Sequence, residues 1–66
     1  MNLSVNGQVR ELADGATVAD LLADLGLGSG WVVIELNRAV VERPQHTSTV
    51  LVDGDVVEVV KAVAGG

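Results

Sequence analysis

The sequence predicts an α+β fold in which a mixed sheet of four to five strands packs on one helix. Two observations support this prediction. Apolar and polar residues alternate in several short segments, which is the period of a β-strand, and in one segment the apolar spacing changes to the period of an α-helix. With 66 residues the chain forms one small domain. A chain of this size buries about 60% of the surface that it exposes when unfolded.

The first two strands are predicted to form a hairpin. Leu3 and Val5 alternate with polar residues, and Asn6-Gly7 follows as a tight-turn signal, because both residue types tolerate a positive φ. A two-residue turn puts Val9 on the opposite face from Val5. We expect the second strand over Val9–Leu12.

The next segment predicts an amphipathic helix. Its apolar residues recur at i, i+3, i+4 and i+7: Val18, Leu21, Leu22 and Leu25. Thr17 is the expected N-cap, with Asp20 three residues later as an Asp version of the capping box. Gly26 supplies the left-handed residue that ends the helix, and Leu27 is placed to pack back on the last turn. Because Gly26, Gly28 and Gly30 follow a helix and lead into a strand, they indicate a connector and not a phosphate-binding loop.

The second half of the chain predicts three more strands. "WVVIELN" at residues 31–37 is apolar on both sides, which is typical of a central strand. A turn at Asn37-Arg38 leads to a short strand at Ala39–Val41, and a polar connection runs from Pro44 through Thr49. Asp53-Gly54-Asp55 is ordinary turn chemistry, since two carboxylates provide far fewer oxygens than calcium needs. The last strand follows it.

The residues offer almost no catalytic chemistry of their own. There is no Cys, so neither a disulfide nor a thiolate metal site is available, and no metal site is expected. His46, the single imidazole, has no evident nucleophile partner and is expected to be a solvated surface residue. Trp31, the single aromatic residue, is expected in the core or packed at an edge of the sheet.

Charge and hydropathy narrow the set of partners. The net charge of −5 argues against nucleic acid, because a basic patch is what neutralises phosphates. No apolar stretch of 18 or more residues is present, so no membrane partner is expected. Met1 leads into a strand pattern and not an export signal, which predicts a cytoplasmic protein. We expect the acidic, valine-rich sheet to bind a protein with a basic docking surface.

The order strand, strand, helix, strand, short strand, strand is that of the β-grasp of ubiquitin-like domains. Within it, the chain resembles the sulfur carrier proteins of thiamin (thiazole) biosynthesis, the ThiS family. The resemblance covers essentially all residues and is carried by these pieces in order: Val5-Asn6-Gly7, Leu36-Asn37, Val41-Glu42-Arg43, Leu51, Asp53-Gly54-Asp55, Val57-Glu58-Val59-Val60 and Ala62-Val63-Ala64-Gly65-Gly66. The chain departs from the family at His46, where Trp is expected, and at Pro44, where Ser is common. Both departures bear on the packing of a loop.

The resemblance implies a function for the terminal Gly-Gly. The chain would divide into a ubiquitin-like domain at 1–61 and a flexible tail at 62–66. The main-chain carboxylate of Gly66 would be the reactive group, adenylated with Mg-ATP by an activating (adenylating) enzyme and then converted to a thiocarboxylate. A desulfurase or a persulfide would be the sulfur donor, and thiazole synthase would receive the sulfur. Four tail residues would bind the partner: Ala62, Val63, Ala64 and Gly65.

On this reading the protein is a carrier and not an enzyme, with no cofactor of its own. Two alternatives remain open. One is a sulfur carrier of the same fold for another cofactor, such as the small subunit of molybdopterin synthase, although the short length and the absence of Phe favour thiamin. The other is a ubiquitin-like interaction module that is never activated.

Overall fold

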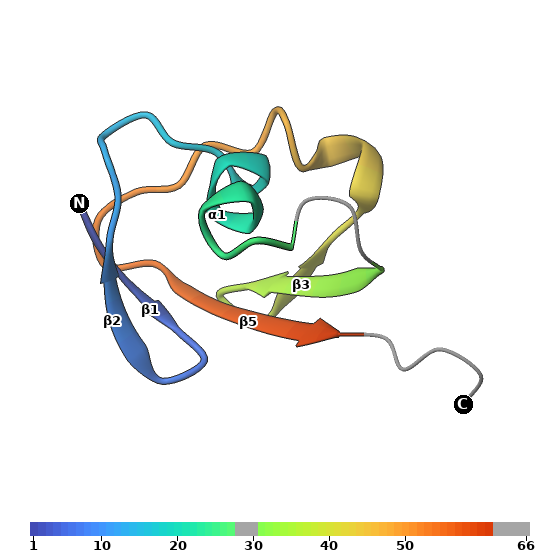
Figure 1. The fold of residues 1–66 in the computed structure, drawn as a ribbon, viewed down its shortest axis with the longest axis horizontal. Coiled ribbons are helices and arrows are strands. Elements are labelled where there is room, and N and C mark those ends of the chain that lie inside the picture. Colours follow the sequence, from blue (N-terminus) through green and yellow to red (C-terminus); the bar gives the residue numbers. More distant parts are fainter. Residues whose placement is uncertain (28–30, 62–66) are drawn as a thin grey trace.

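The computed structural model describes residues 1–27 and 31–61. Within these residues the chain forms one α-helix, five strands and one turn of 3-10 helix (Figure 1). Their bounds are β1 (Asn2–Val5), β2 (Gln8–Glu11), α1 (Val18–Asp24), β3 (Val32–Leu36), β4 (Ala39–Val41), η1 (Arg43–Gln45) and β5 (Val56–Lys61). The predicted order of elements is confirmed, with η1 as an addition in the connection that the sequence predicts to be irregular.

The five strands form one mixed sheet in the order β2-β1-β5-β3-β4. β1 and β5 are parallel, whereas the other three pairs are antiparallel. The last strand of the chain therefore lies in the middle of the sheet, between β1 and β3. The predicted mixed sheet of four to five strands packed on one helix is confirmed.

The β1–β2 hairpin has the two-residue turn that Asn6-Gly7 predicts. Val5 pairs with Gln8, and the φ angles of Asn6 and Gly7 are +50° and +81°. Val9 lies on the opposite face from Val5 and is 80% exposed. Strand β2 begins at Gln8, one residue earlier than predicted, because a two-residue turn leaves Gln8 directly opposite Val5.

Helix α1 is capped at both ends as the sequence predicts. Thr17 Oγ1 accepts a hydrogen bond from the Asp20 N–H at 3.2 Å, and Asp20 Oδ2 accepts one from the Thr17 N–H at 2.9 Å. The next backbone donors are satisfied by a distant loop, since the Ala19 N–H donates to the carbonyl of His46. Gly26 ends the helix with a φ of +75°.

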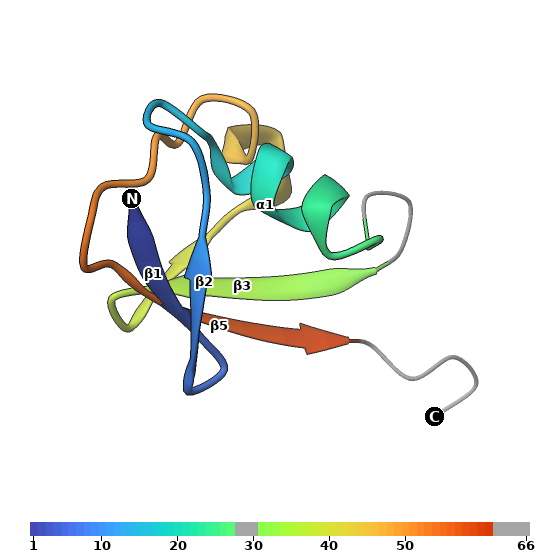
Figure 2. The ribbon, with the colours of Figure 1, turned by 60° about the vertical axis from the view of Figure 1, so that its left-hand side comes forward.

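One face of the sheet forms the core with α1. The buried apolar residues are Leu3, Val5, Val18, Leu21, Leu22, Ile34, Leu51 and Val57. Figure 2 shows α1 and η1 on the same side of the sheet, with no described element on the other side. We call the uncovered side the outer face. Strand β3 lies between β5 and β4, as its two-sided apolar character predicts for a central strand. Only its helix side is covered, because Val33 on the outer face is exposed.

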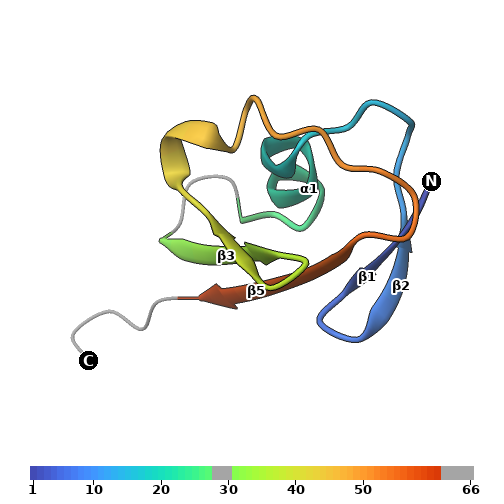
Figure 3. The same cartoon turned by 180° about the vertical axis from the view of Figure 1, so that it is seen from behind.

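Two expectations from the sequence are wrong. His46 is not a solvated surface residue: it is 8% exposed, and its Nε2–H donates to the carbonyl of Val41 at 3.1 Å. The turn η1 folds the loop inward, so His46 fills space beside the core. Trp31 is neither in the core nor packed at an edge, because it is 74% exposed, with the Arg43 guanidinium 4.9 Å from its ring centroid. Figure 3 shows η1, which contains Arg43, following β4.

No helix in residues 1–27 or 31–61 has the length and hydropathy that crossing a membrane requires.

Candidate functional site

The predicted reactive residue, Gly66, and the predicted partner-binding residues Ala62, Val63, Ala64 and Gly65 lie outside the described residues. The same holds for the predicted tail at 62–66. What the structure does describe is the strand that precedes these residues, β5, and the surfaces on both sides of it.

Strand β5 is bound along both edges. On one edge it pairs with β3 over five residue pairs, from Leu36 opposite Val57 to Val32 opposite Lys61. On the other edge it pairs with β1, where the Asn6 N–H donates to the carbonyl of Val57 at 2.9 Å. The last described residue, Lys61, is thus the end of a strand held in the middle of the sheet.

The side chain of Asn6 extends this second edge beyond the end of β1. Asn6 Oδ1 accepts a hydrogen bond from the Val59 N–H at 2.7 Å, and Asn6 Nδ2 donates to the carbonyl of Val59 at 3.2 Å. The amide group takes the place of one more peptide unit of a parallel strand. It satisfies backbone groups of β5 that would otherwise have no partner within the sheet. We call this pair of bonds the Asn6 clamp.

A second side-chain network holds the start of β5. Asp55 is 8% exposed, and its carboxylate accepts hydrogen bonds from the Val52 N–H and from Asn37 Nδ2, both at 2.9 Å. Asn37 Oδ1 in turn accepts from the Val56 N–H at 2.9 Å. Asn37 has a φ of +50°, which asparagine tolerates better than most residues. The turn between β3 and β4 is therefore joined to the first residue of β5.

A pocket of about 290 Å³ lies on the helix side of the sheet, beside the Asn6 clamp. Its wall includes Val5, Val59, Leu25 and Leu27, with polar groups at its rim. Two cations, Lys61 and Arg10, line this pocket, and Arg10 Nε donates to Asp24 Oδ2 at 2.8 Å. This ion pair also places a positive charge at the C-terminal end of α1, where the helix itself has no basic residue.

The outer face of the sheet is largely apolar; the sequence predicts a valine-rich docking sheet but does not identify which of its residues are exposed. Five of the seven exposed valines among the described residues lie there: Val9, Val33, Val40, Val56 and Val60. Contiguous exposed apolar surface on a monomer often marks an interaction site. The signal was present in the sequence, because β3 and β5 are both apolar on two sides and only one helix is predicted to cover them.

The described residues provide neither a cluster of metal-binding side chains nor an exposed imidazole. In residues 1–27 and 31–61 no group of three or more His, Cys, Asp or Glu side chains is placed to hold a metal ion. His46 is buried and bonded to a carbonyl, so its imidazole is not presented to a substrate. The arrangement presents the end of β5 and offers a surface for another protein to bind.

Comparison with known proteins places the chain in a family. The model of the ThiS family matches residues 3–66. The sulfur carrier protein ThiS of Bacillus subtilis is 35% identical over 65 residues, which is 97% of this chain and 98% of the relative. A thiazole synthase of Paramagnetospirillum magneticum is also 35% identical over 66 residues. This chain spans 20% of the length of that thiazole synthase.

A solved structure shows the same fold. The crystal structure of the thiamine biosynthesis protein ThiS from Geobacter metallireducens superimposes with a TM-score of 0.84 at 38% identity, covering all of both chains. The β-grasp fold predicted from the order of elements is thereby confirmed.

Proposed function

Because the chain belongs to the ThiS family of sulfur carriers in thiamin biosynthesis, we propose that it carries sulfur as a thiocarboxylate on the main-chain carboxylate of Gly66. On this proposal the chain is a substrate of other proteins. The proposal rests on the extent of the family match, which runs over residues 3–66 and so includes Gly65 and Gly66.

The proposed chemistry begins with activation, since a carboxylate is a poor electrophile. An adenylating enzyme joins a carboxylate oxygen of Gly66 to the α-phosphorus of Mg-ATP, and pyrophosphate leaves. The resulting mixed anhydride has AMP as its leaving group, and a sulfur nucleophile from a desulfurase or a persulfide displaces it at the carbonyl carbon. With a persulfide donor, a thiol must then cleave the acyl disulfide to release the thiocarboxylate.

The residues before Gly66 are proposed to reach into the enzyme. Gly65 and Gly66 have no Cβ, so a narrow channel admits them and their backbone angles are unrestricted. Ala62 to Gly66 span at most about 18 Å when extended, at roughly 3.3–3.6 Å per residue. Strand β5, bound on both edges, would be the fixed base from which this length is measured. We expect Ala62, Val63, Ala64 and Gly65 to contact the enzyme along the channel.

Thiazole synthase is proposed as the protein that receives the sulfur. The support is that a thiazole synthase of another organism contains a region 35% identical to this entire chain. In that relative, the ThiS-like region and the synthase belong to one chain. A carrier that is a separate chain must instead bind to thiazole synthase, which requires complementary surfaces on the two proteins.

Intact mass spectrometry tests the proposal first. In protein purified from its own cells we expect a species that ends at Gly66 and in which one oxygen is replaced by sulfur, with the change mapping to Gly66. A sulfur-containing mass that maps to an internal residue, or native protein in which Gly66 is followed by further residues, would contradict the proposed site.

A deletion separates the reactive group from the fold. We expect removal of Gly66 to leave the melting temperature almost unchanged, because glycine buries no side chain. We expect ATP–pyrophosphate exchange with the adenylating enzyme to be lost, since the new carboxylate stops about 3.6 Å short and reaction geometry tolerates less displacement than that. A second variant carries one additional Ala after Gly66. It should be equally inactive, because the Gly66 carboxylate is then part of a peptide bond. Full exchange in either folded variant would show that Gly66 is not the site.

A further inference from the structure

The outer face of the sheet has a regular arrangement of residues across its strands. Paired residues share a face, so the register of the strands places Ser4 beside both Val9 and Val56, and places Val33 beside Val60. Between these two rows lies a third, in which Glu58 is opposite Glu35 and Glu35 is opposite Val40. Two carboxylates therefore sit side by side within a field of exposed valines.

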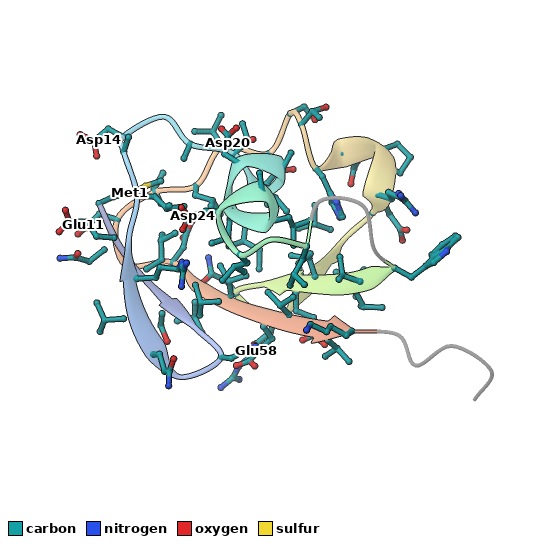
Figure 4. The ribbon with its side chains drawn as sticks, viewed as in Figure 1. Met1, Glu11, Asp14, Asp20, Asp24 and Glu58 are labelled. Atoms are coloured by element: carbon teal, nitrogen blue, oxygen red, sulfur yellow. The ribbon has the colours of Figure 1, made fainter. Side chains whose placement is uncertain are left out.

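The charge of this face has a single sign. At the outward positions of the described strands the ionisable residues are Glu11, Glu35 and Glu58, and none of these positions holds Lys or Arg. Figure 4 shows Glu58 on the side of β5 that faces away from α1. Three of the four Lys and Arg side chains of the chain lie elsewhere: Arg10 is paired with Asp24, Arg43 lies over Trp31, and Lys61 is on the helix side, opposite Val32. The fourth, Arg38, is in the turn between β3 and β4, outside the strands.

Glu35 and Glu58 gain nothing from each other. Like charges directly opposite in an antiparallel pair are destabilising. Neither carboxylate forms an ion pair within residues 1–27 and 31–61, where the ion pairs are those of Met1 with Asp14 and of Arg10 with Asp24. A cation from outside, placed between the two carboxylates, would remove their repulsion and bind to both.

We propose that the outer face docks on the adenylating enzyme, and that Glu35 and Glu58 together hold one lysine or arginine of that enzyme. This inference rests on the proposed function. Charge complementarity favours a protein partner. The exposed valines match an apolar surface, and the two carboxylates match one basic side chain within that surface. A second copy of this chain would instead bring four carboxylates together without a cation, and anionic lipid or nucleic acid would meet only like charge.

The position of the pair also fits the adenylating enzyme. Val60 and Val33 form the last outward row before the end of β5, and Lys61 is the residue from which 62–66 continue. A protein that seats a side chain between Glu35 and Glu58 therefore covers the face next to the point where the proposed tail begins. The same contact fixes the distance from the docking surface to the channel.

The test uses three full-length variants: Glu35→Gln, Glu58→Gln and the double variant. The KM for the carrier and the kcat are measured by ATP–pyrophosphate exchange, and binding to the enzyme is measured without ATP by calorimetry. We expect each single variant to raise KM and Kd about tenfold with kcat unchanged, since it loses a charge-assisted contact. The double variant should exceed the product of the two, because it leaves the enzyme's cation unpaired in the interface.

The matched control is Glu11→Gln, which removes the same charge on the same face but on the edge strand β2, opposite Asn2. We expect it to change KM less than about twofold, because solvent-exposed charges separated by a Debye length of about 10 Å are largely screened. Raising the salt concentration should weaken binding of the wild type more than binding of the double variant. Circular dichroism confirms that every variant is folded.

Each result has a definite reading. Equal effects of Glu11→Gln and Glu58→Gln would overturn the proposed pair, as would a double variant that binds the enzyme normally. Weakened binding to thiazole synthase with normal binding to the adenylating enzyme would also overturn it. If the wild type binds the enzyme but supports no exchange, the proposed function fails, while the calorimetric comparison still decides whether the pair holds a cation.

Discussion

Replacing Asn6 by glycine tests how firmly the end of β5 is held. The variant keeps a residue that accepts the φ of +50° at this position but removes both hydrogen bonds of the Asn6 clamp to Val59. An intramolecular hydrogen bond contributes about 0.5–1.5 kcal/mol net, and the lower values apply to exposed bonds such as these, where water replaces the lost partner. We therefore expect the free energy of unfolding to fall by about 1 kcal/mol.

Asn6→Ala separates the backbone from the side chain. Alanine loses the same two bonds and must also adopt the left-handed conformation, which costs about 1–2 kcal/mol more. For a domain of this size each 1 kcal/mol lowers the melting temperature by about 4–8 °C. The alanine variant should therefore melt clearly below the glycine variant. Circular dichroism is the suitable probe, because the single tryptophan is 74% exposed in the folded state and reports unfolding weakly.

Hydrogen exchange measures the clamp directly. In Asn6→Gly the Val59 amide should exchange faster, while the backbone amide of the new glycine, which still donates to the Val57 carbonyl, should keep its protection. Unchanged exchange at Val59 would refute the clamp. Equal melting temperatures for the glycine and alanine variants would refute the argument from the left-handed turn.

Two further predictions concern stability. His46→Ala should lower the free energy of unfolding in urea by about 1–3 kcal/mol, because it removes a buried side chain and leaves the partly buried carbonyl of Val41 without the Nε2–H donor. A variant as stable as the wild type would show that this hydrogen bond does not stabilise the fold. Glu58→Gln should raise the free energy of unfolding by about 0.2–1 kcal/mol by removing the like charge opposite Glu35. Glu11→Gln, which is opposite Asn2, should not raise it, and an equal gain in both would point to net charge as the cause.

Much of the fold could be predicted because local signals agree with the overall arrangement. The Asn6-Gly7 turn, the Thr17–Asp20 capping box and the Gly26 helix end each depend on residues close together in sequence, and all three are observed. The burial of His46 could not be predicted this way. It depends on η1 turning the loop toward the helix, where the His46 carbonyl accepts from the Ala19 N–H, a contact across 27 positions of sequence.

The candidate site divides in the same manner. The resemblance predicted Gly66 from a local motif, and that prediction stays one, since residues 62–66 lie outside the described structure. The Asn6 clamp and the Glu35–Glu58 pair join positions 53 and 23 residues apart, and only the strand register brings them together. The sequence indicates that Asn6 is a turn residue. It does not indicate that the Asn6 side chain also bonds to the backbone of Val59.

The two faces of β5 explain why this strand suits a carrier. On the helix side Val57 is fully buried and fixes the strand in the core, whereas on the outer side Val56, Glu58 and Val60 contribute little to that core. We therefore expect substitutions on the outer side to leave the fold intact, and we expect the Glu35–Glu58 repulsion to lower stability without serving the packing. If Glu58→Gln both stabilises the domain and weakens binding to the enzyme, the two carboxylates lower the stability of the free protein and contribute to docking. The gain in the free energy of unfolding then gives the stability that the free protein loses by keeping this pair.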